Sequence, residues 1–217
     1  MRLFLAILLV SALGAGALYA QTDGFTVVTT ESARRISIAN HPKKIPDTTL
    51  AFANGMQEGV LRDLQTDGRV AIVNFIYTRC TSVCLAMGSE LQQMQSLIRE
   101  RGLAEKIRLI SISFDPADTP DQLARYARAM RADPAIWGFA GIPSARARDV
   151  LLNTFGIVRV AAPYGQFEHN AAYHVVTANG FLARVVDYAD PLAALDFAVS
   201  QSTHPAGAAL ASLVRSQ

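Results

Sequence analysis

The stretch VAIVNFIYTRCTSVCLAMGSELQQMQSLIR, residues 70–99, changes from one pattern of side chains to another. Residues 70–77 form a nearly unbroken run of β-branched and aromatic side chains, which predicts a strand covered on both faces of a sheet. From residue 84 to 99 the apolar side chains recur at helical spacing, at Leu85, Leu91, Met94, Leu97 and Ile98. The stretch therefore predicts a buried strand followed directly by a helix.

The same order of elements recurs further along the chain. The run KIRLISISF (106–114) predicts a second strand, and the break at Asp115-Pro116 precedes a helix that begins near Thr119, with Pro120 in its first turn. A strand–helix–strand order favours parallel pairing of the strands. The segment WGFAG (137–141) then predicts a short third strand, SARARDVLLNTF (144–155) a helix with Ser144 as its N-cap, and GIVRVAA (156–162) a further strand.

The last third of the chain carries a hairpin signal. YHVVTANGFLARVVDY (173–188) predicts two strands around a turn at Asn179-Gly180, and DPLAALDFAVSQ (190–201) predicts a helix after them. The whole pattern predicts an α/β fold, with a mixed central sheet, flanking helices and a C-terminal β-hairpin plus helix.

The N-terminal residues have the features of a secretory signal. Met1-Arg2 is followed by the apolar run 3–10 and then by small residues, which predicts a signal peptide over 1–20 and hence an exported protein. An uncleaved membrane anchor is the alternative for these residues. We expect an extended arm or linker over 21–46, one domain over 47–202 and a C-terminal tail over 203–217.

The charge balance argues against a nucleic-acid partner. Without Arg2 of the signal, 19 basic residues stand against 18 acidic ones, and no run of Lys or Arg in that part of the sequence is longer than that of Lys43-Lys44.

Cys80 and Cys84, the two cysteines of the chain, are separated by three residues. Residues four apart lie on one face of a helix, so both thiols can face one ion if the first turn includes them. A reversible disulfide is also compatible with this spacing, as is a purely structural bridge. The positive end of the helix dipole and the neighbouring Arg79 are expected to favour the thiolate form of both side chains.

A histidine would complete a metal site of this kind. Two thiolates make a soft site that suits copper(I) or zinc, and one neutral imidazole would give the three-coordinate set that copper(I) accepts. The chain has four histidines. His41 lies in the predicted arm, His204 lies near the C-terminus and His174 lies within a predicted strand. His169 instead lies in the predicted loop GQFEHNAA (165–172). His169 is therefore the favoured third ligand.

The segments YTRCTSVC (77–84), ISFDPADTPDQLARYA (112–127) and HNAAYHVVTANG (169–180), in this order, resemble the Sco/SenC family of exported copper-binding proteins. The resemblance covers roughly residues 46–200. It implies a thioredoxin-like three-layer sandwich. It also implies that Cys80, Cys84 and His169 bind copper and that Asp115 lies close to the site, although capping of a turn explains Asp115 equally well.

The resemblance implies a copper metallochaperone that delivers copper(I) during assembly of the copper centre of cytochrome c oxidase. Its partner would be the copper-binding subunit of the oxidase or another copper chaperone, in the periplasm or at the outer face of the inner membrane. The alternative is an extracytoplasmic thiol-disulfide oxidoreductase that uses Cys80 and Cys84 to reduce partner cysteines. Thr81, Leu85 and Glu168 depart from the family, which commonly has proline, proline and aspartate there.

Overall fold

The computed structural model describes residues 2–21, 30–80 and 83–203 of the 217 residues. The chain divides into two compact units, the first of which ends at His41 while the second begins at Pro42. The first unit contains helices α1 (Arg2–Gln21) and α2 (Thr30–Asn40). Among the described residues, no helix combines the length and the apolar character that a membrane span requires.

The sequence predicted an extended arm over 21–46, but most of the described residues in this range are helical. Residues 30–40 form α2, in which Glu31 pairs with Arg34 at 2.7 Å and with Arg35 at 2.9 Å. Such pairs, three and four positions apart, each stabilise a helix by roughly 0.2–0.5 kcal/mol. Residues Lys43–Lys44 form strand β1, which pairs with β10 (Phe181–Asp187) in the second unit. The sheet thus begins before the predicted domain boundary at residue 47.

The second unit is built on an eight-stranded sheet in the order β1-β10-β9-β4-β5-β6-β2-β3. The three neighbouring strands β4, β5 and β6 are parallel, and every other pair in this sheet is antiparallel. The sheet is therefore mixed, as the sequence predicts. The strands not yet given are β2 (Thr49–Phe52), β3 (Gln57–Gly59), β4 (Val70–Ile76), β5 (Ile107–Ser113), β6 (Trp137–Gly141) and β9 (Ala172–Val176).

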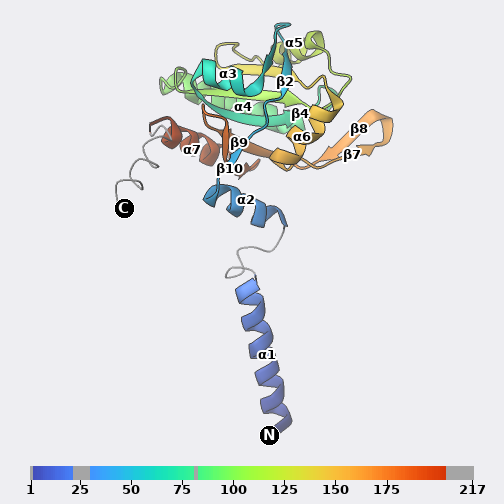
Figure 1. Cartoon of the computed structure of the whole chain (residues 1–217), viewed down its shortest axis with the longest axis vertical. Helices are drawn as coiled ribbons and strands as arrows, with labels where there is room; N and C mark the ends of the chain where they lie inside the picture. The colour runs from blue at the N-terminus through green and yellow to red at the C-terminus, as the bar shows by residue number, and fades with distance from the viewer. Residues whose placement is uncertain (1, 22–29, 81–82, 204–217) are drawn as a thin grey trace. The chain divides into compact units, whose positions relative to one another are not determined.

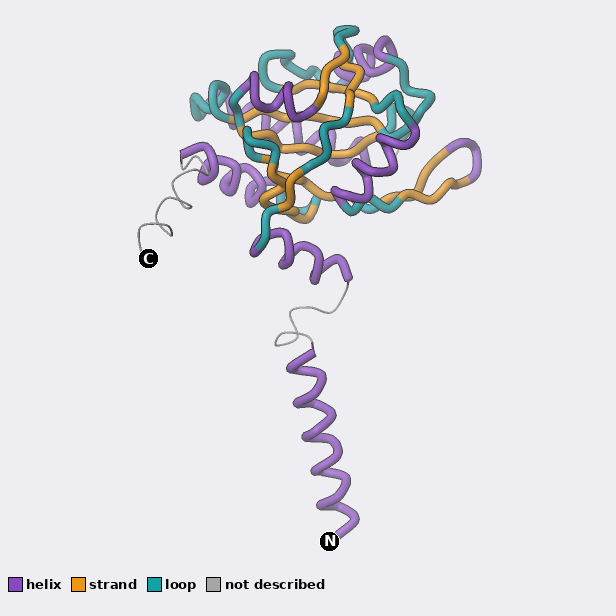
Figure 2. The backbone as a smooth tube through the Cα atoms, in the orientation of Figure 1, coloured by secondary structure: helices purple, strands orange, loops and turns teal. Residues whose placement is uncertain are grey.

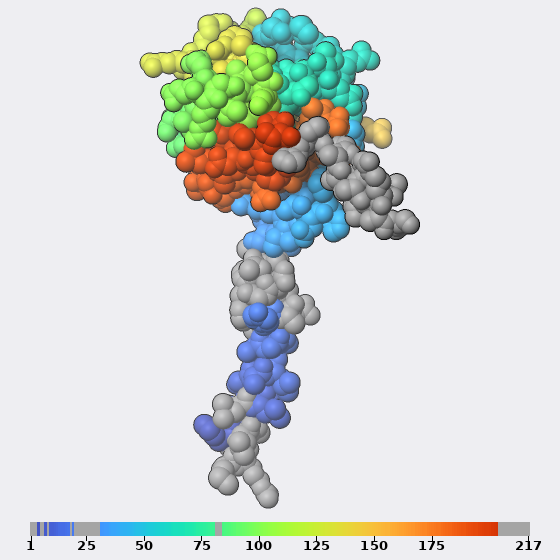
Figure 3. Space-filling view, turned by 90° about the vertical axis from the view of Figure 1, so that its left-hand side faces the viewer, coloured from blue at the N-terminus to red at the C-terminus, as the bar shows by residue number. Residues whose placement is uncertain are grey.

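Helices cover both faces of this sheet (Figure 1). They are α3 (Val60–Asp67), α4 (Val83–Glu100), α5 (Pro120–Ala129), α6 (Ala145–Phe155) and α7 (Pro191–Thr203). On one face Phe155 of α6 packs against Phe75 of β4, with ring centres 5.1 Å apart. On the other face Tyr126 of α5 packs against Phe139 of β6, and α7, red in Figure 3, lies against α4. The three-layer, thioredoxin-like sandwich is confirmed.

The helix starts follow the local signals of the sequence. Thr119 caps α5 in a capping box with Gln122, and Pro120 is the first residue of that helix. The Ser144 hydroxyl caps α6 by accepting a hydrogen bond from the backbone of Ala147. Each residue of β4 and β5 is buried, which explains why apolar residues predominate in both of these central strands.

A separate two-stranded sheet lies beside the central one. Strands β7 (Arg159–Ala162) and β8 (Gln166–His169) pair with each other and are joined by the short 3-10 helix η1 (Pro163–Gly165). We call residues 159–169 the β7–β8 hairpin, which projects from the body of the fold (Figures 1 and 2). The sequence predicted a loop over 165–172. That prediction is wrong for residues 166–169, because QFEH is too short to carry a strand period.

Candidate metal centre

Strand β4 delivers the chain to the first cysteine. After β4 the chain turns tightly, and the backbone N–H of Cys80 donates to the carbonyl of Tyr77 at 3.2 Å. Residues 81–82, which include Thr81, lie outside the described residues, and α4 begins at Val83. Cys84 is thus the second residue of α4, and its backbone N–H donates to Sγ of Cys80 at 3.4 Å. Both thiols therefore meet at the start of α4.

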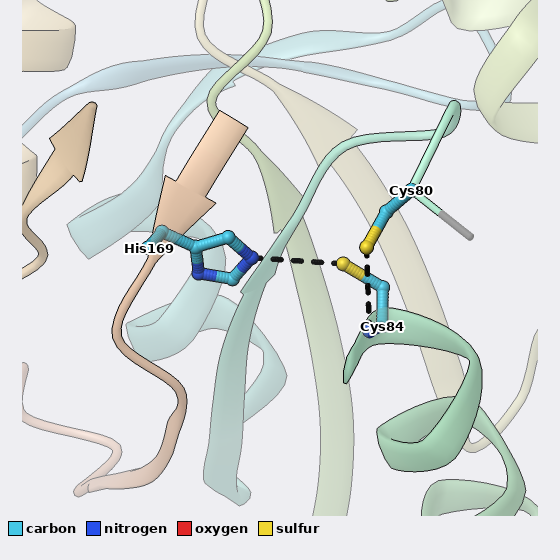
Figure 4. Close-up of side chains that lie close together, drawn as sticks. All are labelled: Cys80, Cys84 and His169. Atoms are coloured by element: carbon cyan, nitrogen blue, oxygen red, sulfur yellow. Dashed lines mark hydrogen bonds between the residues drawn. The ribbon is translucent and has the colours of Figure 1, made fainter. Parts of the chain in front are cut away.

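The third group comes from the end of β8. His169 is the last residue of that strand, and its Nδ1 lies 2.9 Å from the backbone carbonyl of Asn170. A carbonyl can only accept a hydrogen bond, so Nδ1 carries a proton, and in the neutral ring the lone pair lies on Nε2. That Nε2 lies 3.7 Å from Sγ of Cys84. Figure 4 draws this contact between the two side chains as a dashed line. This tautomer is the one that a metal ligand needs.

Cys80, Cys84 and His169 form one compact group. Their ligand atoms all lie within 4.8 Å of one another, and in the described part of the chain this is the one group of His, Cys, Asp or Glu that could hold a metal ion. At zinc-like ligand distances of roughly 2.0–2.3 Å, three ligands around one ion lie about 3.5–4.0 Å from one another. A small contraction is therefore enough for the three atoms to surround one ion.

The pKa of Cys84 differs from the expectation drawn from the sequence. Its hydrogen bond with Cys80 and its burial raise the pKa of Cys84, so this side chain is a neutral thiol at pH 7 in the metal-free protein. Arg79 was expected to stabilise the thiolates, but its guanidinium pairs with Asp115 at 2.7 Å instead. The prediction of a stabilised thiolate is wrong for Cys84, and a bound metal must displace its proton.

Asp115 is buried and makes two contacts through its carboxylate. One oxygen accepts from Arg79, and the other accepts from the backbone N–H of Ala117 at 2.9 Å, which closes the turn before α5. Asp115 thus caps the turn, and it reaches the neighbour of Cys80 rather than a ligand atom. A tuning role for Asp115 in the metal site stays a prediction.

Asp118 is a buried carboxylate that the sequence reasoning missed. It accepts hydrogen bonds from the backbone N–H of Thr78 at 2.8 Å, from the Thr78 hydroxyl at 2.6 Å and from the Ser113 hydroxyl at 2.6 Å. Asp118 therefore fixes the chain two residues before Cys80. Thr78 is 40 positions away in the sequence, so no local pattern pointed to this contact.

His174 belongs to the core, as its place in a predicted strand suggested. It is fully buried in β9, where Nδ1 lies 3.3 Å from the carbonyl of Val73 and Nε2 lies 3.2 Å from that of Phe155. Its ring also packs edge-on against Phe75. Of the other two histidines, His41 lies in the first unit, and His204 lies outside the described residues together with nearly all of the predicted tail.

The fold and the site together define a class of protein: a thioredoxin-like domain with two thiols and an imidazole gathered where β4 meets α4. A family model described as SCO1/SenC matches residues 46–202, well over half of the chain. The chain therefore belongs to the SCO1/SenC family.

Individual relatives are distant. The SCO1 protein homolog of Bacillus subtilis (strain 168) is 27% identical over 116 residues, a match that covers 52% of this chain and 59% of that protein. The crystal structure of Arabidopsis thaliana ScoI with copper bound has a TM-score of 0.59 at 16% identity, covering 72% of this chain and 98% of that one. BsSco, described as a Sco family cytochrome c oxidase assembly protein with a disulfide switch, has a TM-score of 0.59 at 23% identity, covering 75% of this chain and 95% of that one. The two structural similarities establish the shared fold.

Proposed function

We propose that this protein binds copper(I) through Cys80, Cys84 and His169 and delivers it during assembly of the copper centre of cytochrome c oxidase. The observation that carries the proposal is the convergence of two cysteine sulfurs and one imidazole nitrogen within 4.8 Å. Membership of the SCO1/SenC family supports it, and so does the copper found in the related Arabidopsis ScoI structure.

The donor set favours copper(I) over other metals. Two thiolates and a neutral imidazole are soft ligands, and copper(I) accepts three of them, whereas structural zinc usually takes four. Within the described residues, no fourth His, Cys, Asp or Glu joins the three. A calcium or magnesium ion would require oxygen ligands instead.

Delivery requires that the ion can leave as well as enter. The two cysteines are buried, whereas His169 is half-buried and is thus the ligand nearest to solvent. An acceptor with its own soft ligands would replace His169 first and the thiolates afterwards, by ligand exchange. We propose the copper-binding subunit of the oxidase, or another copper chaperone, as the acceptor. The signal-like residues 1–20 support a site of action in the periplasm or at the outer face of the inner membrane.

Thiol-disulfide exchange is the second candidate function. It is favoured by the contact between Cys84 and Sγ of Cys80, and by the disulfide switch described for BsSco. Two observations count against it as the main role. The raised pKa of Cys84 lowers its reactivity, because the thiolate is the attacking form. Thiol-disulfide exchange would also not explain why His169 lies beside Cys84.

An anaerobic competition titration tests the proposal. The reduced protein is titrated with copper(I) against a chromogenic chelator, beside the variants Cys84→Ser and His169→Ala and the control His41→Ala. We expect one-to-one binding that is abolished by Cys84→Ser, weakened about tenfold or more by His169→Ala and unchanged in the control. If His169→Ala leaves copper(I) affinity unchanged, the result would instead favour Cys80 and Cys84 as a redox pair.

A further inference from the structure

The position of His169 depends on the β7–β8 hairpin, which shares no strand pairing with the central sheet. At its root, Asn170 binds the backbone of Val158 at 2.8 Å through its side chain and the carbonyl of Gly156 at 2.9 Å. These contacts join the two ends of the hairpin to each other and to the end of α6. They do not tie it to β4 or to the cysteines.

Besides the contact between His169 and Cys84, the side chain of Tyr77 connects the hairpin to the end of β4. Tyr77 follows β4 directly and lies three residues before Cys80. Its hydroxyl lies 3.0 Å from Oε1 of Gln166 and 3.2 Å from the carbonyl of Phe167, to either of which it can donate. The same hydroxyl accepts from the backbone N–H of Phe167 at 3.3 Å. Tyr77 thus engages both main-chain polar groups of a residue in β8.

The ring of Tyr77 extends this contact towards His169. Phe167 and His169 are two residues apart in β8, so their side chains lie on the same face of the strand. The ring centre of Tyr77 lies 5.3 Å from that of Phe167 and 6.1 Å from that of His169, edge-on in both cases. Phe114 closes the same cluster at 5.0 Å from His169. Tyr77 itself is almost fully buried.

We propose that Tyr77 is a positioning residue for the metal site, whose hydroxyl fastens the β7–β8 hairpin to the end of β4 and so keeps His169 beside Cys84. This inference rests on the proposed function, because it assumes that His169 is a ligand. The remaining polar tie between the hairpin and α6 is the pair of Arg159 with Asp149 at 3.5 Å, which is solvent-exposed and weak. Without the Tyr77 hydroxyl, aromatic packing has to hold the hairpin against the end of β4.

The variant Tyr77→Phe keeps the ring and removes these hydrogen bonds. We expect its affinity for copper(I) to fall about fivefold to tenfold, the size of effect expected for one net hydrogen bond. The readout specific to positioning is a double-mutant cycle with His169→Ala. In the His169→Ala background, Tyr77→Phe should cause a much smaller loss, because the residue that it positions is already absent and only the contact of Tyr77 with Cys80 is left to be removed.

Tyr173→Phe is the matched control. Tyr173 is also a fully buried tyrosine, and its hydroxyl has no hydrogen-bond partner among the described residues. Its removal should leave copper(I) affinity unchanged in both backgrounds. Far-ultraviolet circular dichroism and thermal unfolding of each variant establish that it is folded before it is titrated.

The outcomes separate the inference from the function on which it rests. If His169→Ala lowers the affinity but Tyr77→Phe does not, the positioning role is wrong and the ligand set stands. If Tyr77→Phe lowers the affinity equally in both backgrounds, Tyr77 acts on the fold or the thiols and the inference is again wrong. If His169→Ala leaves the affinity unchanged, the proposed ligand set fails, and the positioning role with it.

Discussion

Asp118 offers a sharp test of how the first cysteine is held in place. We predict that Asp118→Asn lowers the free energy of unfolding by roughly 2–3 kcal/mol, although Asp118 contacts none of the three candidate ligand atoms directly. The carboxylate is 8% exposed and accepts the backbone N–H and hydroxyl of Thr78 and the hydroxyl of Ser113.

The magnitude follows from the loss of charge on the acceptor. A hydrogen bond to a charged group contributes about 1.5–3 kcal/mol, and a neutral one about 0.5–1.5 kcal/mol. The change to an amide therefore removes about 1 kcal/mol for each of two or three bonds, while the Thr78 hydroxyl can rotate to accept from the new amide. Asp118→Ala should cost more, about 3–5 kcal/mol, because it leaves buried donors without a partner.

Urea denaturation followed by circular dichroism measures both changes. Asp196→Asn is the control, since Asp196 is 71% exposed and lies 3.6 Å from Arg101, a surface pair whose loss should change stability by about 0.5 kcal/mol or less. An Asp118→Asn variant as stable as the Asp196→Asn control would refute the reasoning, because the buried carboxylate would then have no structural role.

Three further predictions concern stability. Phe155→Ala should lower the free energy of unfolding by about 3–5 kcal/mol, because it opens a cavity under α6, and chemical denaturation measures this. Ser144→Ala should cost about 1 kcal/mol, since it removes the cap of the same helix, and a loss as large as that of Phe155→Ala would contradict it. Burial alone would raise the pKa of Asp67, but the hydrogen bonds with Arg69 and the charges of Arg108 and Arg69 together outweigh burial and lower the pKa. The charged carboxylate therefore stabilises the fold above the ordinary pKa, and this effect is lost as the pH falls through the lowered value. Asp67→Asn should thus flatten the acid limb of a stability–pH profile.

The parts of the fold that the sequence predicts well are those with a long, regular period. The central strands β4 and β5 are rich in β-branched apolar residues, and α4 has an apolar face, so their order alone indicated a parallel βαβ arrangement. The parts that it misses are short or depend on partners elsewhere. Strand β1 is two residues long and owes its existence to pairing with β10, and α2 has little apolar period.

The candidate site also has parts that the sequence predicts and parts that it misses. The spacing of Cys80 and Cys84 was visible in the sequence, and His169 could be chosen among four histidines because of its place before a hairpin. The roles of Tyr77 and Asp118 could not be read in this way. The decisive hydrogen bonds join Tyr77 to Phe167, 90 positions away, and Asp118 to Thr78, 40 positions away, and such pairs leave no periodic signal in a single sequence.

The central claim is that Cys80, Cys84 and His169 hold one copper(I) ion together. X-ray absorption at the copper edge, on protein loaded anaerobically with one equivalent of copper(I), tests it most directly because it counts the atoms bound to the metal. We predict two sulfur ligands and one nitrogen ligand, with the nitrogen lost in His169→Ala. A site of sulfur ligands alone, unchanged by His169→Ala, would contradict the account.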